Sequence, residues 1–491
     1  MKFLRAFLAA TALLATAAYA APKDSVTIGI ALEPPGLDPT TGAAASIGDI
    51  VHYNVFEGLT KIGDDFSVTP LLAESWTVSP DAKTLTFKLR KGVHFQNGEP
   101  LTSQDVKFSF ERAAAADSTN KEKAFFQSIA ATDATDPDVV IPTFKAPSFD
   151  ALFHLGLNTA VIVEPKSAAT NGANPVGGGP YKLAEWSRGS AVTLKKWDGY
   201  RDAGKVAIAT ATFRFINDSS AQVAGLLAGD IDAIPRFDGL ASLDQFKSDE
   251  RFQVIVGGTE GKTILAINNK RKPFDDLRVR QALAFAVDRK ALIEGAVNGL
   301  GAPIGSHLVP SDPGYVDLTG EYAHDPEKAK ALLKAAGVTT PLNVGLILPP
   351  PSYARRGGEI VAAELAEVGI QAKIENVEWA QWLSGVYKDK NYDLTIISHV
   401  EPLDIGIYAN PDYYFQYDSQ KFRDIYAKLT AAPDLAAFKA AIGDAQRQLA
   451  DDSVNVFLFQ LQQASLADAR LTDLWRNAPI FATDLAALSW R

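Results

Sequence analysis

Hydrophobic and polar residues alternate with two different periodicities along this chain, one typical of strands and one typical of helices. Short runs of strand-forming residues bounded by turns predict strands at residues 26–31, 74–78, 84–89, 139–144, 192–196, 212–216 and 263–268. Helical spacing of apolar residues predicts helices at residues 46–59, 220–228 and 276–297. From residue 342 onwards, strands at 342–348, 372–377 and 392–398 alternate with helices at 357–368 and 379–387, and helices at 421–429 and 435–450 follow. Strand–helix alternation of this kind indicates an α/β domain.

Local signals mark several element ends. Thr102 to Asp105 forms a capping box before a helical stretch. Asp275 and Asp276 suit the positive end of the helix predicted at 276–297. Gly229 is a common residue after the last turn of a helix and is expected to end the one at 220–228.

The sharpest break in the chain is the segment NPVGGGP, residues 174–180. Three glycines flanked by prolines cannot continue a helix or a strand, so we place a domain boundary there. The chain has 491 residues, which is too long for a single hydrophobic core, and two or three domains are expected.

The first twenty residues have the pattern of an export signal. Lys2 and Arg5 precede an apolar run at residues 6–18, and Ala18-Tyr19-Ala20 is a small-x-small cleavage site. The run is shorter than the roughly 20 residues that a membrane span needs. We expect a mature protein that begins at Ala21, lies in the periplasm and is soluble. No cysteine follows the cleavage site, so an N-terminal lipid anchor is not expected.

Composition excludes several kinds of chemistry. The chain contains no cysteine, which rules out disulfides, thiolate catalysis and cysteine metal sites. The formal net charge is −10, and no basic run is present, so a nucleic-acid partner is not expected. The segment at residues 257–263 imitates a phosphate loop, but it is one residue short and precedes a strand. The six histidines have no H-E-x-x-H spacing, so neither a metal site nor a cofactor is predicted.

Several blocks of the sequence, in the right order, resemble the family 5 extracellular solute-binding proteins, the peptide and nickel receptors of ATP-driven importers. The block from Leu71 to Phe110 and the block from Pro273 to Arg289 match the family's pattern almost throughout. Asp38-Pro39 follows the first strand as the family's L-D-P does, LLAGDIDA ends at Ala233, and PVGGGPYKL is similar to P-V-G-T-G-P-Y-x-L. In the last of these, Gly178 replaces threonine.

The resemblance implies an α/β fold of two lobes that face each other across a cleft, with a hinge between them and a third domain inserted in the first lobe. After the signal at residues 1–20, lobe I is expected to comprise residues 21–58, 176–269 and 480–491. The inserted domain is expected at residues 59–175, and lobe II at residues 270–479.

The resemblance also implies where ligand charges bind. Residues 352–356 look like the A-R-R segment that supplies the arginine for the peptide carboxylate in dipeptide receptors, and the sequence does not separate Arg355 from Arg356. A guanidinium suits a carboxylate because two parallel donors match two oxygens. The segment from His399 to Asp404 falls where dipeptide receptors carry an aspartate for the ammonium. Glu401 occupies that place, and Asp404 is the alternative.

This segment departs from the family, whose W-x-G/A-D-Y becomes His-Val-Glu-Pro, so the carboxylate is kept but is one methylene longer. On the first-lobe side, Ser46 and the small residues 42–45 are expected to line the cleft and leave room for ligand backbone.

We therefore expect a monomeric receptor, without enzymatic activity, that closes over a dipeptide, an oligopeptide or a peptide-like opine. It would then dock on the transmembrane subunits of an ABC permease. Receptors for an opine, a nickel chelate or an oligosaccharide are alternatives, the last with Trp379 and Trp382 stacking on sugar rings. A secreted hydrolase that uses Glu401 and Asp404 is the remote alternative.

Overall fold

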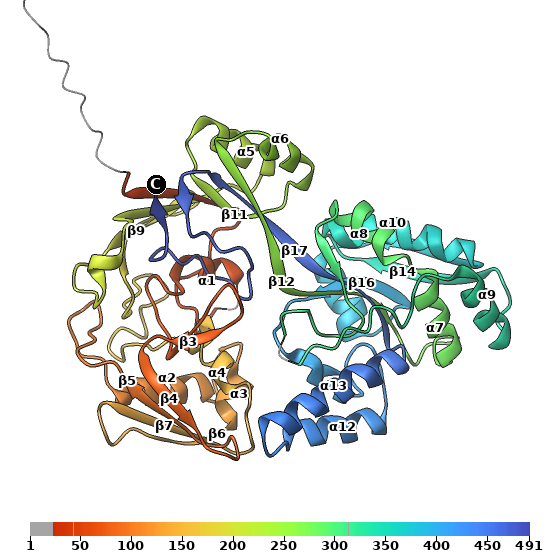
Figure 1. Ribbon diagram of the computed structural model, residues 1–491, viewed down its shortest axis with the longest axis horizontal. Helices are drawn as coiled ribbons and strands as arrows, with labels where there is room; N and C mark the ends of the chain where they lie inside the picture. The colour runs from red at the N-terminus through yellow and green to blue at the C-terminus, as the bar shows by residue number, and fades with distance from the viewer. Residues whose placement is uncertain (1–22, 43, 313) are drawn as a thin grey trace, which may run out of the picture.

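The computed structural model of the protein describes residues 23–42, 44–312 and 314–491. The predicted export signal at residues 1–20 and its cleavage site lie outside these described residues. Two lobes lie side by side and are connected by two long strands, β12 (Phe252–Ile267) and β17 (Asn455–Asp468) (Figure 1). The predicted two-lobed α/β fold is confirmed by this arrangement and by the comparisons given below.

A single sheet runs through both lobes. Its order is β15-β14-β16-β12-β17-β11-β1-β10-β9-β8, and β13 (Gly301–Pro303) pairs with β17 beside this path. In the second lobe it contains β15 (Ile370–Asn376), β14 (Leu342–Leu348) and β16 (Leu394–His399). In the first lobe it contains β11 (Ala233–Phe237), β1 (Ser25–Ile30), β10 (Thr210–Phe215), β9 (Ala191–Lys196) and β8 (Tyr181–Ser187).

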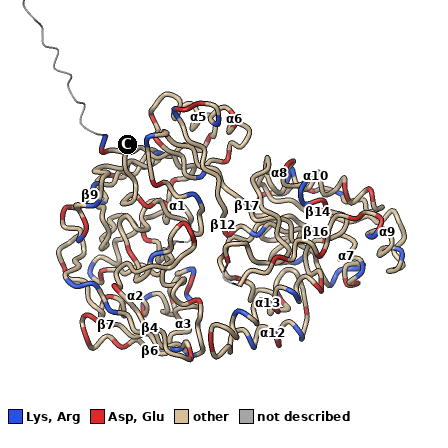
Figure 2. The backbone as a smooth tube through the Cα atoms, in the orientation of Figure 1, with Lys and Arg blue, Asp and Glu red and all other residues tan. Residues whose placement is uncertain are grey.

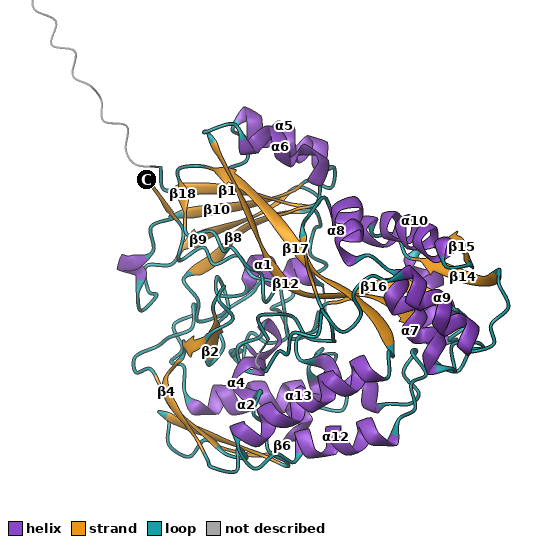
Figure 3. Cartoon of the chain, turned by 45° about the vertical axis from the view of Figure 1, so that its right-hand side comes forward, coloured by secondary structure: helices purple, strands orange, loops and turns teal. Residues whose placement is uncertain are grey.

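The two connecting strands belong to both lobes. Residues 252–258 of β12 pair with the end of β17 that also pairs with β11, whereas residues 262–267 pair with β16. The boundary expected between lobe I and lobe II, after residue 269, therefore lies just after β12, a strand that passes through both lobes. Figure 3 shows β12 and β17 running from the strands of the first lobe towards β16.

A second, four-stranded sheet belongs to the first lobe. It has the order β4-β5-β7-β6, made of β4 (Ala73–Val78), β5 (Leu85–Leu89), β7 (Val139–Phe144) and β6 (Ile129–Asp133). Helices α2 (Ser103–Ala114), α3 (Lys123–Ser128) and α4 (Ala151–His154) accompany it. The predicted capping box is confirmed, because Asp105 accepts hydrogen bonds from the Thr102 backbone N–H and hydroxyl. Short pairs are formed by β2 (Thr60–Ile62) with β3 (Val68–Pro70), and by β18 (Leu471–Thr472) with β19 (Ser489–Trp490).

Two predicted helices are shorter or broken. The helix expected at 46–59 is α1 (Ala45–Val51), after which the chain turns within the core. The helix expected at 276–297 is two helices, α7 (Leu277–Ala286) and α8 (Arg289–Val297). Asp288 starts the second one by accepting hydrogen bonds from the backbone N–H groups of Lys290 and Ala291. The apolar spacing continues across the break, so periodicity could not reveal it.

The remaining helices cover the lobes. They are α5 (Ser219–Ala228), α6 (Leu243–Lys247), α9 (Pro326–Ala335), α10 (Ser352–Glu367), α11 (Trp379–Trp382), α12 (Gln420–Thr430) and α13 (Leu435–Asp451). Gly229 ends α5 with a left-handed φ of 79°, as its position predicted. No described helix has the length and apolarity that a membrane crossing requires.

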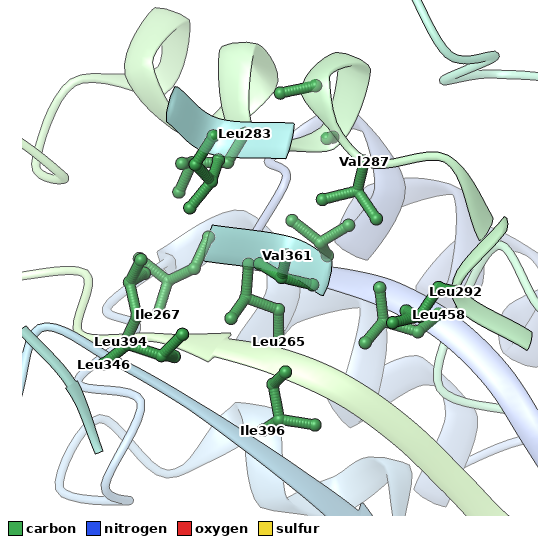
Figure 4. Packing of buried hydrophobic residues seen from close by; sticks show 14 of the residues in the cluster. Leu265, Ile267, Leu283, Val287, Leu292, Leu346, Val361, Leu394, Ile396 and Leu458 are labelled. Atoms are coloured by element: carbon green, nitrogen blue, oxygen red, sulfur yellow. The ribbon is translucent and has the colours of Figure 1, made fainter. Parts of the chain in front are cut away.

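The core of the second lobe lies between the sheet and helices α7, α8 and α10. Figure 4 shows Leu283 and Val361 from two of these helices packed against Leu265 of β12 and Leu394 of β16. All four side chains are fully buried. This core fixes the second-lobe half of β12, which continues directly into the interlobe cleft.

Gly257 of β12 is needed for close packing of the C-terminal segment. A Cβ at this position would lie 1.9 Å from the carbonyl oxygen of Arg476. A Cβ and a backbone carbonyl cannot turn away from each other as flexible side chains can, so the backbone would have to shift. Gly257→Ala is therefore expected to destabilise the protein by about 1–3 kcal/mol in chemical unfolding. Gly204→Ala is the control, because a Cβ there has no neighbour within 4 Å and should change stability by about 0.5 kcal/mol or less. Equal stabilities of the two variants would contradict this role.

Candidate functional site

A cleft lies between the lobes where β12 and β17 cross from one to the other. Its volume is about 940 Å³, including the solvent-filled space at its mouth. Both lobes contribute to its walls. The lining includes residues 121–122, Arg236, residues 259–261, residues 400–402, residues 461–463 and residues 478–481.

Strand β12 bulges at this crossing. Gly258 pairs with Gln462 and Lys262 with Gln460, so three residues of β12 lie opposite Leu461 alone. Thr259 Oγ1 donates to the Leu461 carbonyl at 2.5 Å, and the amide of Gly261 donates to the same hydroxyl at 2.9 Å. A β-bulge redirects side chains and is common beside functional sites. Here it brings Glu260 into the cleft wall. The segment that imitates a phosphate loop, predicted to precede a strand, lies within β12 itself.

Arg236, on β11, presents a fixed guanidinium at the first-lobe wall. Its Nε donates to Asp49 Oδ1 at 3.0 Å, its Nη1 to Gln463 Oε1 at 2.9 Å and its Nη2 to the Ile480 carbonyl at 3.1 Å. The guanidinium carbon also lies 4.5 Å from the ring centroid of Phe481. A guanidinium has five donors, so one N–H on each Nη remains beyond these three bonds. Arg236 is oriented by its neighbours while its side chain stays 28% exposed.

Asp49 lies in α1 and is the countercharge of Arg236. Burial raises the pKa of Asp49, and the adjacent guanidinium of Arg236 opposes that rise. The charge of Arg236 therefore keeps a buried carboxylate ionised and is itself held by it. Loss of either partner would leave the other buried without its countercharge.

On the second-lobe wall, a buried lysine fixes the segment that carries Glu401. Lys262 is fully buried, and its ammonium donates to the Glu401 carbonyl at 2.6 Å and lies 3.0 Å from Asp404 Oδ1. Asp404 also accepts a hydrogen bond from His307 Nε2 at 3.0 Å. Although burial disfavours its charge, His307 and Lys262 bring the pKa of Asp404 well below its usual range. Asp404 is thus engaged within the lobe, whereas the Glu401 side chain is half exposed in the cleft.

Two contacts join the lobes across the cleft. Lys121, in the loop between α2 and α3, lies 3.4 Å from Glu401 Oε1. Phe149 of the first lobe packs against Phe438 of α13 with 5.3 Å between the ring centroids. An exposed ion pair contributes little, about 0–1 kcal/mol, so a ligand can replace it at small cost.

His307, His399 and Asp404 form the one group of potential metal ligands found among the described residues, with ligand atoms within 4.8 Å of one another. Burial lowers the pKa of His307, and burial with His307 alongside lowers the pKa of His399 to about 3, so the His399 ring is neutral at pH 7. Each ring also meets a tyrosine hydroxyl: Tyr408 at 3.0 Å from His307 Nδ1, and Tyr414 at 2.9 Å from His399 Nε2. Because the Lys262 ammonium already supplies the countercharge, this cluster acts as a buried polar network.

The other predicted site residues lie outside the lining of this cleft. Arg355, on α10, donates to the Val377 carbonyl at 3.2 Å and to Glu378 Oε1 at 3.3 Å, and Arg356 is exposed on the same helix. Ser46 is buried in α1, one turn before Asp49. Their roles in binding stay predictions. His399 is buried behind the loop that carries Glu401.

The sugar-stacking alternative finds no support in the geometry. Trp382 is buried and donates its indole N–H to Thr395 Oγ1 at 3.0 Å, and Trp379 is exposed elsewhere on the lobe. Neither residue lines the cleft.

Three cleft residues were missed from the sequence: Lys121, Arg236 and Glu260. Arg236 carried a usable signal, since it is the one charge in the apolar strand AIPRF, and such a charge needs a buried partner or a ligand. Glu260 lies in a glycine-rich stretch with Thr259 and Lys262 beside it, so it had no comparable signal. Lys121 lies in a polar loop and had no such signal. Lys121, Arg236 and Glu260 come together only because the fold places three distant segments of the chain next to one another.

Two lobes joined by crossing strands, with a cleft lined from both sides, define a two-lobed solute-binding protein. Residues 67–423 match the family described as bacterial extracellular solute-binding proteins, family 5 Middle. The chain is 30% identical to the dipeptide-binding protein of Escherichia coli (strain K12), over 78% of this chain and 76% of that protein. It is 31% identical to the glutathione-binding protein GsiB of the same strain, over 76% and 73%.

Among solved structures, the binding protein AgaA of A. tumefaciens R10 in complex with agropinic acid is 29% identical. It has a TM-score of 0.78, with 95% of this chain and 99% of that chain covered. The chain therefore belongs to the family 5 extracellular solute-binding proteins, which confirms the resemblance found in its sequence blocks.

Proposed function

We propose that this protein is the periplasmic receptor of an ABC importer and that it closes over a small zwitterionic, peptide-like solute. The observation that carries the proposal is the charge of the cleft. Arg236 and Lys121 lie on the first-lobe wall, and Glu401 and Glu260 lie on the second-lobe side. Glu122 also lines the first-lobe wall, but its carboxylate lies 3.2 Å from His154 Nδ1 within that lobe. A zwitterion that contacts both walls stabilises the closed state, because it pairs with opposite charges on the two lobes. The relatives named for dipeptides and glutathione bind solutes of this kind.

Each ligand charge has a proposed partner. Arg236 would receive the carboxylate on its two remaining donors, with Lys121 beside it, and Glu401 would receive the ammonium. The Lys121–Glu401 ion pair would open as the ligand takes its place. Arg355 and Arg356 stay candidates for the carboxylate, and Ser46 for the ligand backbone. We place Arg236 first because neighbouring groups already fix its geometry.

The proposal includes export and delivery. We propose that residues 1–20 direct export and that the mature receptor works as a monomer which hands its solute to permease subunits. We further propose lobe I at residues 21–58, 176–269 and 480–491, the inserted domain at 59–175 and lobe II at 270–479. Figure 2 shows acidic and basic residues interspersed along the backbone of both lobes, and the formal net charge of −10 disfavours a nucleic-acid partner.

The proposed receptor has no catalytic role. In the hydrolase alternative, Glu401 and Asp404 would have to face one substrate together. Asp404 is instead paired with Lys262 and His307 inside the lobe. An opine is a narrower variant of the same proposal, since an opine keeps the carboxylate of its parent amino acid, and it is favoured by the likeness to the AgaA structure with agropinic acid.

Ligand screening tests the proposal. Protein purified without refolding is first analysed by mass spectrometry for a bound solute. Its unfolding temperature is then measured with alanyl-alanine, glutathione, agropinic acid, a nickel–histidine complex and maltotriose. A true ligand at about 100 times its Kd should add about 2.7 kcal/mol of stability.

We expect stabilisation by alanyl-alanine, glutathione or both, and stabilisation by agropinic acid would favour the opine variant. Stabilisation by maltotriose or the nickel complex alone would contradict the proposal. Turnover of the peptides during hours of incubation would favour the hydrolase.

A further inference from the structure

Glu260 occupies an unusual position for a carboxyl group. The bulge of β12 places it in the cleft wall, yet the residue is only 4% exposed. Its Oε2 has no hydrogen-bond partner among the described residues. A buried polar atom without a partner is costly, so one that lines a ligand cleft points to a group supplied from the cleft.

Behind Glu260, acids outnumber cations. Asp312 lies behind it, within side-chain hydrogen-bonding reach of the Glu260 carboxyl group. A hydrogen bond between the two requires a proton, because two carboxylates have acceptors only. Asp404 is the third acid nearby, and Lys262 is the one cation among these four groups. If Glu260 and Asp312 were both ionised, the buried cluster would carry an excess negative charge.

We propose that Glu260 and Asp312 share a proton in the unliganded receptor and release it to solvent when a cationic group of the ligand binds at Glu260. This inference rests on the proposed capture of a zwitterion, and it assigns that ligand a cationic group such as an ammonium. In the step, the O–H bond of the Glu260 carboxyl breaks and its proton leaves through the cleft. The carboxylate formed pairs with the ammonium, which keeps its own protons and has donors left for Glu401.

The electrostatics of the cluster agree with the geometry. Burial, together with the adjacent charge of Asp312, raises the pKa of Glu260 to about 9. Burial likewise raises the pKa of Asp312, and Lys262 opposes this rise. A ligand cation favours the ionised form and lowers the pKa of Glu260. Between the bound and free pKa values the ligand therefore displaces one proton, and above both values it displaces none.

The groups that face Glu260 come from several elements. Lys262 comes two residues after Glu260 on β12. Asp312 comes from the loop after β13, and Asp404 comes from the segment after β16. Lys121, Arg236 and Glu401 share the cleft with it. His307, bonded to Asp404, has a pKa lowered by burial, and Asp404 opposes this shift.

Calorimetry of the full-length mature receptor measures the proton directly. Alanyl-alanine is titrated at pH 7.0 in phosphate, HEPES and Tris buffers, whose ionisation enthalpies differ. The wild-type protein should release about one proton per peptide bound, and Glu260→Gln about none. Glu327→Gln is the matched control, since Glu327 is an exposed residue of α9, and it should release the same number as the wild type. If the wild type and Glu260→Gln bound alanyl-alanine equally well and the wild type released no proton, the inference would be overturned. The proposed function would remain intact.

A measurement without ligand separates the two proposals further. The Glu260 carboxyl ionises near its ordinary pKa in the unfolded chain but at a higher pH in the folded protein. The wild type therefore loses stability, relative to Glu260→Gln, as the pH rises from about 5 towards 9. The unfolding temperature of the wild type, taken relative to that of Glu260→Gln, should therefore fall from pH 5 to pH 8. A difference between the two unfolding temperatures that does not change with pH would overturn the shared proton, even if no peptide bound and the proposed function had failed.

Discussion

Replacing Arg236 by alanine should weaken the binding of a carboxylate-bearing ligand by about 2–5 kcal/mol, the range for removing one partner of a buried charge pair. The guanidinium is already held by Asp49, Gln463 and the Ile480 carbonyl, so it meets the ligand without further ordering. Its loss would leave the ligand carboxylate desolvated and without a bidentate partner. Isothermal titration calorimetry with alanyl-alanine measures the effect.

Two controls keep this result interpretable, because Arg236→Ala also deprives Asp49 of its countercharge. The first is alanyl-alanine amide, which lacks the carboxylate. The wild type should bind it weakly, and Arg236→Ala should make little further difference, whereas a general folding defect would weaken both peptides alike. The second control is the pair Arg355→Ala and Arg356→Ala, for which we expect losses below about 1 kcal/mol. A large loss in either, with Arg236→Ala unchanged, would transfer the carboxylate site to α10.

Replacing Lys262 by methionine should lower the free energy of unfolding by about 3–5 kcal/mol, the cost of removing one partner from a buried ion pair. Methionine keeps most of the aliphatic stem but removes the charge. The ammonium bonds to the Glu401 carbonyl and to Asp404, and both would then be buried without their donor. Urea unfolding at pH 7 measures the loss.

Lys330→Met is the matched control for this effect. Lys330 forms an exposed pair with Glu327 on α9, so its replacement should cost about 0.5 kcal/mol or less. Adding Asp404→Asn to Lys262→Met should restore part of the lost stability, because the unpaired charge is then gone. A loss below about 1 kcal/mol for Lys262→Met would show that the buried pair contributes little, and Glu401 would need another support.

Local signals allowed many elements to be predicted from the sequence. The capping box of Thr102 and Asp105, the end of α5 at Gly229 and the strand at 263–268 depend on neighbouring residues, so they were visible without the fold. The break between α7 and α8 was not visible, because Asp288 starts a new helix inside an apolar pattern that continues on both sides. The bulge of β12 was also hidden, since it depends on pairing with β17, about 200 residues further along the chain.

The candidate site was predicted in part for the same reason. The sequence identified the segment of Glu401, because it follows a strand in a recognisable block. It offered Asp404 as an equal candidate, and only the contacts with Lys262 and His307 show that this carboxylate is engaged. Arg236, Lys121 and Glu260 come from three distant segments, and no local pattern relates them.

By itself, the sequence determined the class of this protein: its apolar periodicities, turns and family blocks specify a two-lobed α/β solute-binding protein. The tertiary structure alone decided which charges meet in the cleft. The reason is physical, because hydrogen-bonding propensity and apolar spacing act between residues close in the chain. The pairing of Arg236 with Asp49, or of Glu260 with Asp312, arises only when separate segments are packed together and lose their water.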